Sequence, residues 1–567
     1  MTPLDPIFGN LLTDLPLRPP ATVLQPERIG AAWPTSLSFA QLMLNRIQAG
    51  SWQIKLSQNR LDDNGVGEVL YTIDSGDQVF YFVIFSQQLS PEERTDRVIA
   101  DGWDAAAALC EGELTPERLA ELRRNVPRQE YGRADPHTLV WTRGNRSSRF
   151  FDYVVDQLAA GEQPDPSVLA KGGYIFRSTA YYGNTKFGLK SYRAFGTDHP
   201  LHGSFMPQML AAFMFREYAA DLAEHIAQAK SESAVPLAPE IRRYLGIGNA
   251  TGMGMVPFVI NHPHLTHTWS MIREIPLARA KQQMIDASHT DVGRFRGLLD
   301  HCITYFTQDT LDVSHTFAHR EQLTTELTQI RAEISGWADW PERPWATLCS
   351  WAEATLSVET QELLHAILIQ LYPEHTTDLP PYLDNIYQGE PNLIQSVAEL
   401  QALIKTTYSW VFGTDVEQEK GDALFWYFSA DSEEPLIGTK DETKGAWSAR
   451  PLDIPLQVYK LHCDLQDRDP DQLIGSFLFD FPHHRAIIGR VQSTQSLRYA
   501  EIHTNLHHQD FIPLYTQRFQ LAQYGMNRFN PQSIYWLRVT LLQGAPIASD
   551  VAQGEAPSST FFPLPPI

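Results

Sequence analysis

The densest group of side chains able to bind a small anion lies in residues 177–195, RSTAYYGNTKFGLKSYRAF. Phenol, amide and cationic groups crowd around two glycines there, and such donors suit recognition of a carboxylate or a phosphate. We expect Tyr182, Asn184 and Arg193 to bind the substrate. Lys186 would transfer a proton or, if desolvated, act as a Schiff-base nucleophile. The alternative is a solvated turn with ordinary surface cations.

A second unusual segment is RRYLGIGNATGMGMVPFVINHP, residues 242–263, in which four glycines follow a G-x-G-x-x-x-G-x-G pattern. A glycine-rich turn that opens a helix presents free N–H groups and the positive end of the helix dipole to an anion. We therefore expect a loop in which Gly248, Asn249 and Thr251 contact the substrate, with Asn249 and Thr251 as caps of a following helix. The pattern is neither a Rossmann fingerprint nor a P-loop. Close packing of two backbones is the alternative.

Three histidines follow directly, in the order H-x-H-x-x-H at His262, His264 and His267. Residues three apart share a helix face, so His264, His267 and Met271 would line one pocket. We expect His262 or His264 to move a proton. The spacing is not H-E-x-x-H and no carboxylate is adjacent, so no metal site is predicted here. Structural histidines are the competing interpretation.

Other polar groups give weaker signals. If residues 501–507 are extended, one strand face carries a row of polar side chains, those of Glu501, His503, Asn505 and His507. Such a row suits a metal or a polar substrate, although an exposed strand face is the favoured interpretation. Asp221 and His225 share a helix face and would form a general base if buried. The adjacent pair His483 and His484 is weaker still.

Composition limits the classes of partner. The chain has 567 residues and a formal charge of −22, so its global field disfavours binding to nucleic acid or to an anionic membrane. Its longest apolar stretches have seven residues, against about 20 for a membrane span. The N-terminus does not resemble a secretory signal, and the four cysteines lie far apart without a CxxC pair. We therefore expect a cytosolic location.

The elements that must position these residues indicate an α+β multidomain protein. Residues 1–160 read as an α+β region with an antiparallel meander, and residues 161–371 as a mainly helical central domain with the two glycine-rich loops. A proline-rich linker, 372–391, precedes a mixed α/β region, 392–567, that ends in a proline-rich strap docked through Phe561 and Phe562.

Within these regions the patterns predict individual elements. Alternating apolar residues predict strands around Trp52–Leu56 and Val69–Ile73, and a denser apolar run predicts a strand at 79–85. Segments 425–430, 455–463 and 534–542 also read as strands. Helices are predicted to begin at Pro91 and Pro116, each preceded by a Ser or Thr cap. Further helices are predicted at 202–230, 265–287, 290–308, 319–336 and 356–371.

Together these features favour a cytosolic metabolic enzyme that acts by acid–base chemistry on a small anionic substrate. The substrate would lie between loops 177–195 and 246–264, with the cofactor undetermined. A nucleotide- or flavin-dependent oxidoreductase or transferase is one alternative, and a non-catalytic binding or scaffold protein is another. Long apolar helix faces would also suit pairing into a homodimer, the commonest assembly.

Overall fold

The structure is a computed structural model of the whole chain. It describes residues 7–11, 15–30, 36–90, 102–128, 135–178, 195–252, 263–308, 320–384, 390–413, 425–429, 435–438, 446–451, 454–501, 519, 522–531, 536–554 and 562–566. Side chains are described throughout these ranges except at residues 10, 26, 30, 250–252, 413, 425–451 and 527–538. The α+β multidomain class predicted from the sequence is confirmed.

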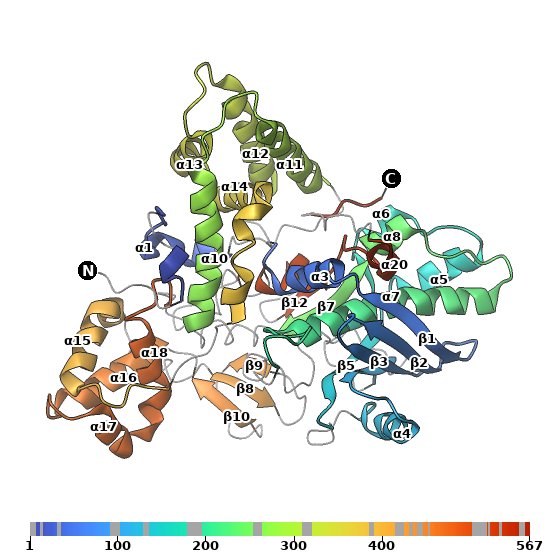
Figure 1. Ribbon diagram of the computed structural model, residues 1–567, viewed down its shortest axis with the longest axis horizontal. Helices are drawn as coiled ribbons and strands as arrows, with labels where there is room; N and C mark the ends of the chain where they lie inside the picture. The colour runs from blue at the N-terminus through green and yellow to red at the C-terminus, as the bar shows by residue number, and fades with distance from the viewer. Residues whose placement is uncertain are drawn as a thin grey trace.

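A nine-stranded sheet, in the order β1-β2-β3-β4-β5-β6-β7-β12-β11, extends from the centre of the molecule, where β7 and β12 lie, to the side that carries β1 to β3 (Figure 1). Its strands are β1 (Gln53–Leu61), β2 (Gly67–Asp74), β3 (Val79–Ser86), β4 (Ala105–Glu111), β5 (Thr138–Arg146), β6 (Tyr174–Ser178), β7 (Gly246–Gly252), β12 (Trp536–Leu541) and β11 (Met526–Pro531). The predicted meander is present as β1 to β3, which pair antiparallel. The sheet crosses the expected boundary at residue 160, and its last two strands come from beyond the proline-rich segment.

One strand pair in this sheet is parallel. β6 and β7 run in the same direction, with Arg177 opposite Gly248. The chain between them contains two helices, α7 (Met206–Lys230) and α8 (Pro239–Tyr244). This connection is a βαβ crossover, because parallel strands cannot be joined by a tight hairpin.

Helix α7 is the central element of the core. Its residues from Met206 to Ala220 are buried on all sides, so the helix is covered by its own chain. Arg216, midway along it, donates hydrogen bonds to the backbone oxygens of Leu245 at 2.7 Å and Pro546 at 2.8 Å. This guanidinium therefore fixes α7 against the start of β7 and the segment after β12. The other helices near the sheet are α3 (Phe39–Ala49), α4 (Pro116–Asn125), α5 (Phe151–Ala159), α6 (Pro166–Leu169) and α20 (Ala548–Gln553). The short helices α1 (Pro20–Val23) and α2 (Pro26–Gly30) pack against each other, and α2 contacts the later helix at 358–371.

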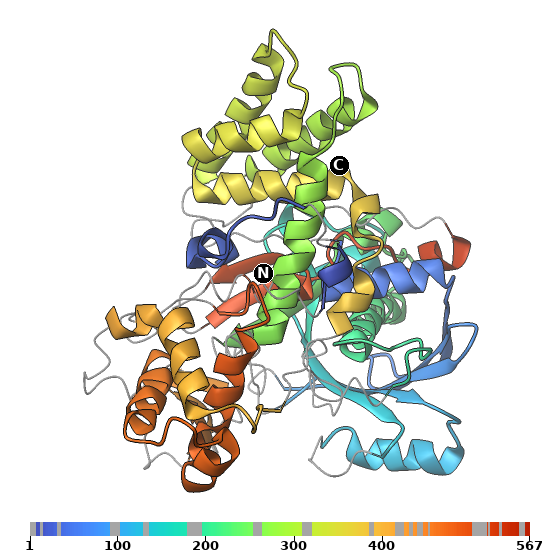
Figure 2. The same cartoon turned by 60° about the vertical axis from the view of Figure 1, so that its left-hand side comes forward.

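A second hydrophobic core belongs to a group of helices that projects from the sheet (Figures 1 and 2). These are α10 (Pro263–Lys281), α11 (Thr290–Phe306), α12 (Arg320–Gly336), α13 (Pro344–Thr355) and α14 (Val358–Leu371). The bounds of α11, α12 and α14 agree closely with predicted helices, α10 ends six residues before its predicted end, and α13 was not predicted. As predicted, the C-terminal segment docks through an aromatic ring, since Phe562 lies 4.7 Å from the ring of Tyr305. Phe561 lies outside the described residues.

A third group contains the C-terminal helices α15 (Val397–Thr407), α16 (Ile454–Gln466), α17 (Ile474–Asp480) and α18 (Arg485–Ser493). The prediction of a strand at 455–463 is wrong, because this segment is part of α16. Its buried residues Ile454, Val458, Leu461 and Leu465 repeat at the helical period. This period is clear only over the whole helix, and the shorter segment 455–463 does not reveal it. A small sheet, β10-β8-β9, consists of β8 (Phe425–Ser429), β9 (Pro435–Gly438) and β10 (Ala446–Pro451).

The two predicted helix starts lie at Pro116 and Pro91. Helix α4 begins at Pro116 with the hydroxyl of Thr115 accepting from Arg118 N–H, as predicted. The helix expected at Pro91 lies outside the described residues. Among the described helices, none combines the length and the apolar composition needed to cross a bilayer.

Candidate functional site

The two segments that the sequence singled out begin at the same edge of the sheet. β6 ends at Ser178 and β7 at Gly252, and parallel strands present their carboxyl ends together. The chain leaves β6 into residues 179–194 and leaves β7 into residues 253–262, both of which lie outside the described residues. In open sheets, ligands bind preferentially beyond the carboxyl ends of parallel strands. This edge is therefore the candidate site.

Asn249 of β7 lies beside the end of β6 and carries a buried polar group. Its side chain is 5% exposed, and its amide nitrogen donates to the backbone oxygen of Ser178. Within the described part of the chain, its amide oxygen has no hydrogen-bond partner. A buried acceptor without a donor is costly, so such a group calls for an explanation. The hydroxyls of Ser178 and Thr142 lie 3.2 Å apart beside it, which adds further polarity.

The expectation of a glycine-rich loop opening a helix at 246–252 is wrong. Gly248, Asn249 and Thr251 belong to β7, a strand paired on both sides, with Val539 of β12 opposite Asn249. The glycines permit close packing instead. A Cβ on Gly248 would lie 2.6 Å from the ring of Tyr174. Asn249 is thus placed by sheet pairing and not by a helix cap.

The amino end of α7 also points towards this edge. Arg216 anchors α7 at Leu245, next to the start of β7. Met206 lies ten residues earlier, about 15 Å along the helix at 1.5 Å per residue, and so on the side of the strand's carboxyl end. Phe205, the N-cap, adopts a left-handed conformation with φ 61°, and no side chain caps the helix. The positive end of the helix dipole thus adds to the field near the site.

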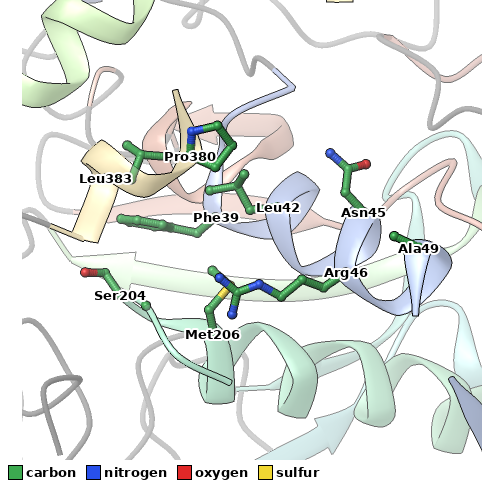
Figure 3. A pocket seen from close by; sticks show the side chains of 10 residues that line it. Phe39, Leu42, Asn45, Arg46, Ala49, Ser204, Met206, Pro380 and Leu383 are labelled. Carbon is green, nitrogen blue, oxygen red and sulfur yellow. The ribbon is translucent and has the colours of Figure 1, made fainter. Parts of the chain in front are cut away.

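A small cavity of about 230 Å³ opens between α3, the start of α7 and the short helix η5 (Pro380–Asp384) (Figure 3). Phe39, Leu42 and Met206 give it a mainly apolar lining. The guanidinium of Arg46 crosses its floor and donates to the backbone oxygens of Pro200 and His202. Its volume is below the roughly 300 Å³ typical of ligand sites, so we assign it no substrate.

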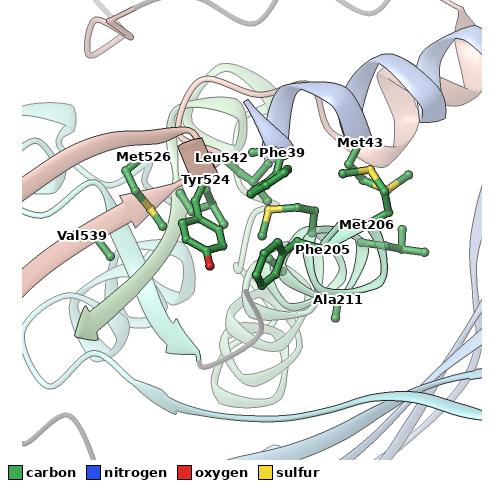
Figure 4. Close-up of a cluster of buried hydrophobic side chains, with 14 of the residues drawn as sticks. Phe39, Met43, Phe205, Met206, Ala211, Tyr524, Met526, Val539 and Leu542 are labelled. Carbon is green, nitrogen blue, oxygen red and sulfur yellow. The ribbon is translucent and has the colours of Figure 1, made fainter. Parts of the chain in front are cut away.

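Aromatic side chains pack the space between this cavity and the sheet. The rings of Phe39, Phe205 and Tyr524 lie within 5.5 Å of one another, and Figure 4 shows the Tyr524 hydroxyl directed past Phe205. This cluster holds the strained turn at Phe205 in place, because the left-handed conformation is unfavourable for a phenylalanine.

His264 and His267 lie in α10, the helix that follows residues 253–262. Burial, together with the neighbouring His267, lowers the pKa of His264 to about 4, so its imidazole is neutral at pH 7. A base this weak is poorly matched to proton abstraction at neutral pH. His267 is fully buried, and its Nδ1 accepts the backbone N–H of Tyr499 at 3.1 Å. Met271 is also fully buried, so His267 and Met271 belong to the protein core, whereas His264 is only partly buried.

The remaining predicted residues fall into two groups. The first group lies outside the described residues and comprises Tyr182, Asn184, Lys186, Arg193, His262, His503, Asn505 and His507. Asp221 and His225 form the second group, and each contacts a different partner and not the other. Asp221 binds Arg242 at 2.6 Å, whereas His225 faces the backbone oxygen of Asp62 at 2.9 Å. The proposed Asp221–His225 base is therefore not formed.

Sequence reasoning missed the buried ion pairs. Glu501 accepts from Arg490 and from the hydroxyl of Tyr408, which lies 2.7 Å away, and is therefore a buried structural carboxylate. Arg18 is bound to Glu274 and Glu362, each at 2.7 Å. No local pattern could have revealed these contacts, since the partners come from distant parts of the chain.

Comparisons with protein-family models, with curated proteins and with solved structures gave no match to this chain.

Proposed function

We propose that the protein is a cytosolic enzyme that acts by acid–base chemistry on a small carboxylate or phosphate. The substrate would bind beyond the carboxyl ends of β6 and β7. The observation that supports this most directly is Asn249, whose buried amide oxygen has no donor among the described residues and which lies in β7 beside Ser178, the last residue of β6. A substrate hydroxyl or protonated group would supply that donor.

In this proposal each residue has a distinct task. Asn249 orients the substrate, and its bond to Ser178 holds the amide in one direction. Arg193 and Lys186, with Tyr182 and Asn184, bind the anionic group from the segment after β6. The amino end of α7 adds favourable potential, and fixed donors of this kind stabilise charge that develops during reaction.

Proton transfer is assigned to Lys186 or His262. His264 stays neutral at pH 7 because of its lowered pKa, so it suits hydrogen bonding to the substrate better than proton abstraction. Gly248 and Thr251 act through the shape of β7. The homodimer expected from apolar helix faces is not part of the proposal, because α7 is buried within a single chain.

Thermal unfolding with a panel of simple anions tests the proposal. We expect inorganic phosphate or a small carboxylate, such as pyruvate or succinate, to raise the melting temperature of the wild-type protein. Saturation at 100 times Kd stabilises the folded state by about 2.7 kcal/mol. Arg193→Ala and Lys186→Ala should each abolish this increase, because each removes a cation from the binding segment.

Lys230→Ala provides the matched control. Lys230 is an exposed lysine paired with Asp156 at 2.9 Å, away from the proposed site, and its loss should leave the anion response unchanged. A wild-type protein that responds to none of the anions, or Arg193 and Lys186 variants that respond as the wild type does, would rule the proposal out.

A further inference from the structure

Two histidines and an aspartate converge among the C-terminal helices, away from the β6–β7 edge (Figure 1). Asp464 lies on α16, and His483 and His484 form the end of the short helix η9 (Pro482–His484). One ligand atom from each residue lies within 4.8 Å of the other two. His484 Nε2 and Asp464 Oδ2 are the closest, at 2.7 Å.

The fold holds one of these ligands firmly and leaves another accessible. His484 is 4% exposed, and its ring stacks on Phe477 and Phe481 with centroids 6.0 and 6.2 Å away. His483 is exposed, and its ring centroid lies 4.1 Å from that of His484. A fixed buried imidazole beside an accessible one allows an ion to enter from solvent and be closed in by a rotation of His483.

The two arginines nearest the cluster in sequence are paired with carboxylates outside it. Arg468 and Arg485 lie near it in sequence, but each has an acidic partner of its own, Asp480 at 3.7 Å and Glu390 respectively.

A simple hydrogen bond between His484 and Asp464 accounts for only two of the three groups. We propose that Asp464, His483 and His484 form a binding site for a divalent transition metal ion of the zinc class. Two imidazole nitrogens and one carboxylate oxygen are the donors that zinc accepts, whereas calcium and magnesium prefer oxygen alone.

The geometry needs only small movements to accept the ion. Zinc–nitrogen bonds of about 2.0–2.1 Å in a tetrahedral arrangement place ligand atoms roughly 3.3 Å apart. His484 and Asp464 would separate slightly from 2.7 Å, and His483 would move inward. Three protein ligands leave a fourth position for water or a small ligand, which is the arrangement of open zinc sites.

Zinc titration of the full-length protein tests this site directly. After treatment with EDTA and its removal, we would measure zinc binding by competition with a chromophoric chelator and the bound stoichiometry by elemental analysis. His483→Ala should weaken the binding at this site by at least about 100-fold, since even the loss of an outer-shell partner costs roughly 10- to 100-fold. Asp464→Asn should act in the same direction while keeping the shape of the side chain.

A second histidine–aspartate contact supplies the control. His289 lies 3.3 Å from Asp291 but belongs to no three-ligand cluster among the described residues. His289→Ala should therefore retain wild-type zinc affinity and stoichiometry. Equal zinc binding in the wild type, His483→Ala and Asp464→Asn would overturn the proposal, as would a wild-type protein that binds no zinc.

Discussion

Glu362 lies at the centre of a buried group of charges that joins three segments far apart in the chain. It accepts hydrogen bonds from Arg18 at 2.7 Å and Arg28 at 3.0 Å, and Arg18 also binds Glu274 at 2.7 Å. The side chains of Glu362 and Glu274 are each only 1% exposed. Removing one partner of such a group leaves an uncompensated buried charge, which costs more than the intact pair contributes.

Glu362→Gln should consequently destabilise the fold by about 3–5 kcal/mol. Burial alone would raise the pKa of Glu362, but Arg18, with His365 and Arg273, holds it well below its usual range, and the pKa of Glu274 is also lowered. A carboxyl with a depressed folded pKa contributes stability above its unfolded value, about 4.3, and loses that contribution as pH falls. Wild-type melting temperature should therefore fall below about pH 4.5, and the slope should be shallower in Glu362→Gln.

An exposed ion pair gives the comparison for this experiment. Arg331 and Asp300 are 3.1 Å apart with side chains about half exposed, 49% and 54%. Asp300→Asn should cost about 1 kcal/mol or less, because water screens exposed pairs. Similar losses in the two variants would show that burial does not control the energy of the Glu362 group.

At the scale of elements, β7 depends on glycine for close packing and not for turning. A Cβ on Gly246 would lie 2.5 Å from the backbone oxygen of Leu541 in β12, and neither backbone can move without disturbing the sheet. Gly246→Ala should lower stability by about 1–3 kcal/mol, the usual cost of overpacking. Gly293→Ala should instead raise the stability of the fold, by about 0.5–1 kcal/mol. Gly293 lies inside α11 with open space around it. Calorimetric melting of both variants checks the two signs together.

The same strand shows what sequence patterns can predict. Regular elements with strong local signals, such as β3 and the start of α4, were predicted correctly because their apolar period and caps are local. The strand β7 was not predicted, because four glycines in a short segment fit a loop and a closely packed strand equally well. Asn249 was identified as a site residue for its amide group, but its position beside the last residue of β6 depends on the pairing of β7 with β6 and β12, which are distant in sequence.

At the scale of the whole molecule, one sheet draws strands from all three regions that the sequence suggested. Boundaries at 160 and 372–391 follow real changes in composition, but such changes do not show which strands pair. The edge formed by β6 and β7 is likewise a product of tertiary structure. Composition and residue spacing identified the two segments that follow β6 and β7. Only the parallel pairing of these strands explains why both segments begin at one edge of the sheet.

The end of the chain joins the sheet region to the projecting helices. Phe562 is 6% exposed, and its ring lies 4.7 Å from Tyr305 and 5.0 Å from Phe306, both on α11. Its backbone oxygen lies 2.7 Å from His301 Nε2. Because the chain reaches this point from β12 and α20, the contact connects the first core to the second.

Phe562→Ala should weaken that connection selectively. Truncation of a buried phenylalanine costs about 3–5 kcal/mol when the cavity cannot close. Hydrogen exchange should therefore speed up in α11 while β3 and β4 keep their protection. Phe479 is 91% exposed, and Phe479→Ala should change stability by no more than about 0.5 kcal/mol. Equal acceleration in α11 and in the sheet would mean that the two cores unfold as one unit. No acceleration in α11 would mean that the C-terminal segment contributes nothing to the stability of the helices it covers.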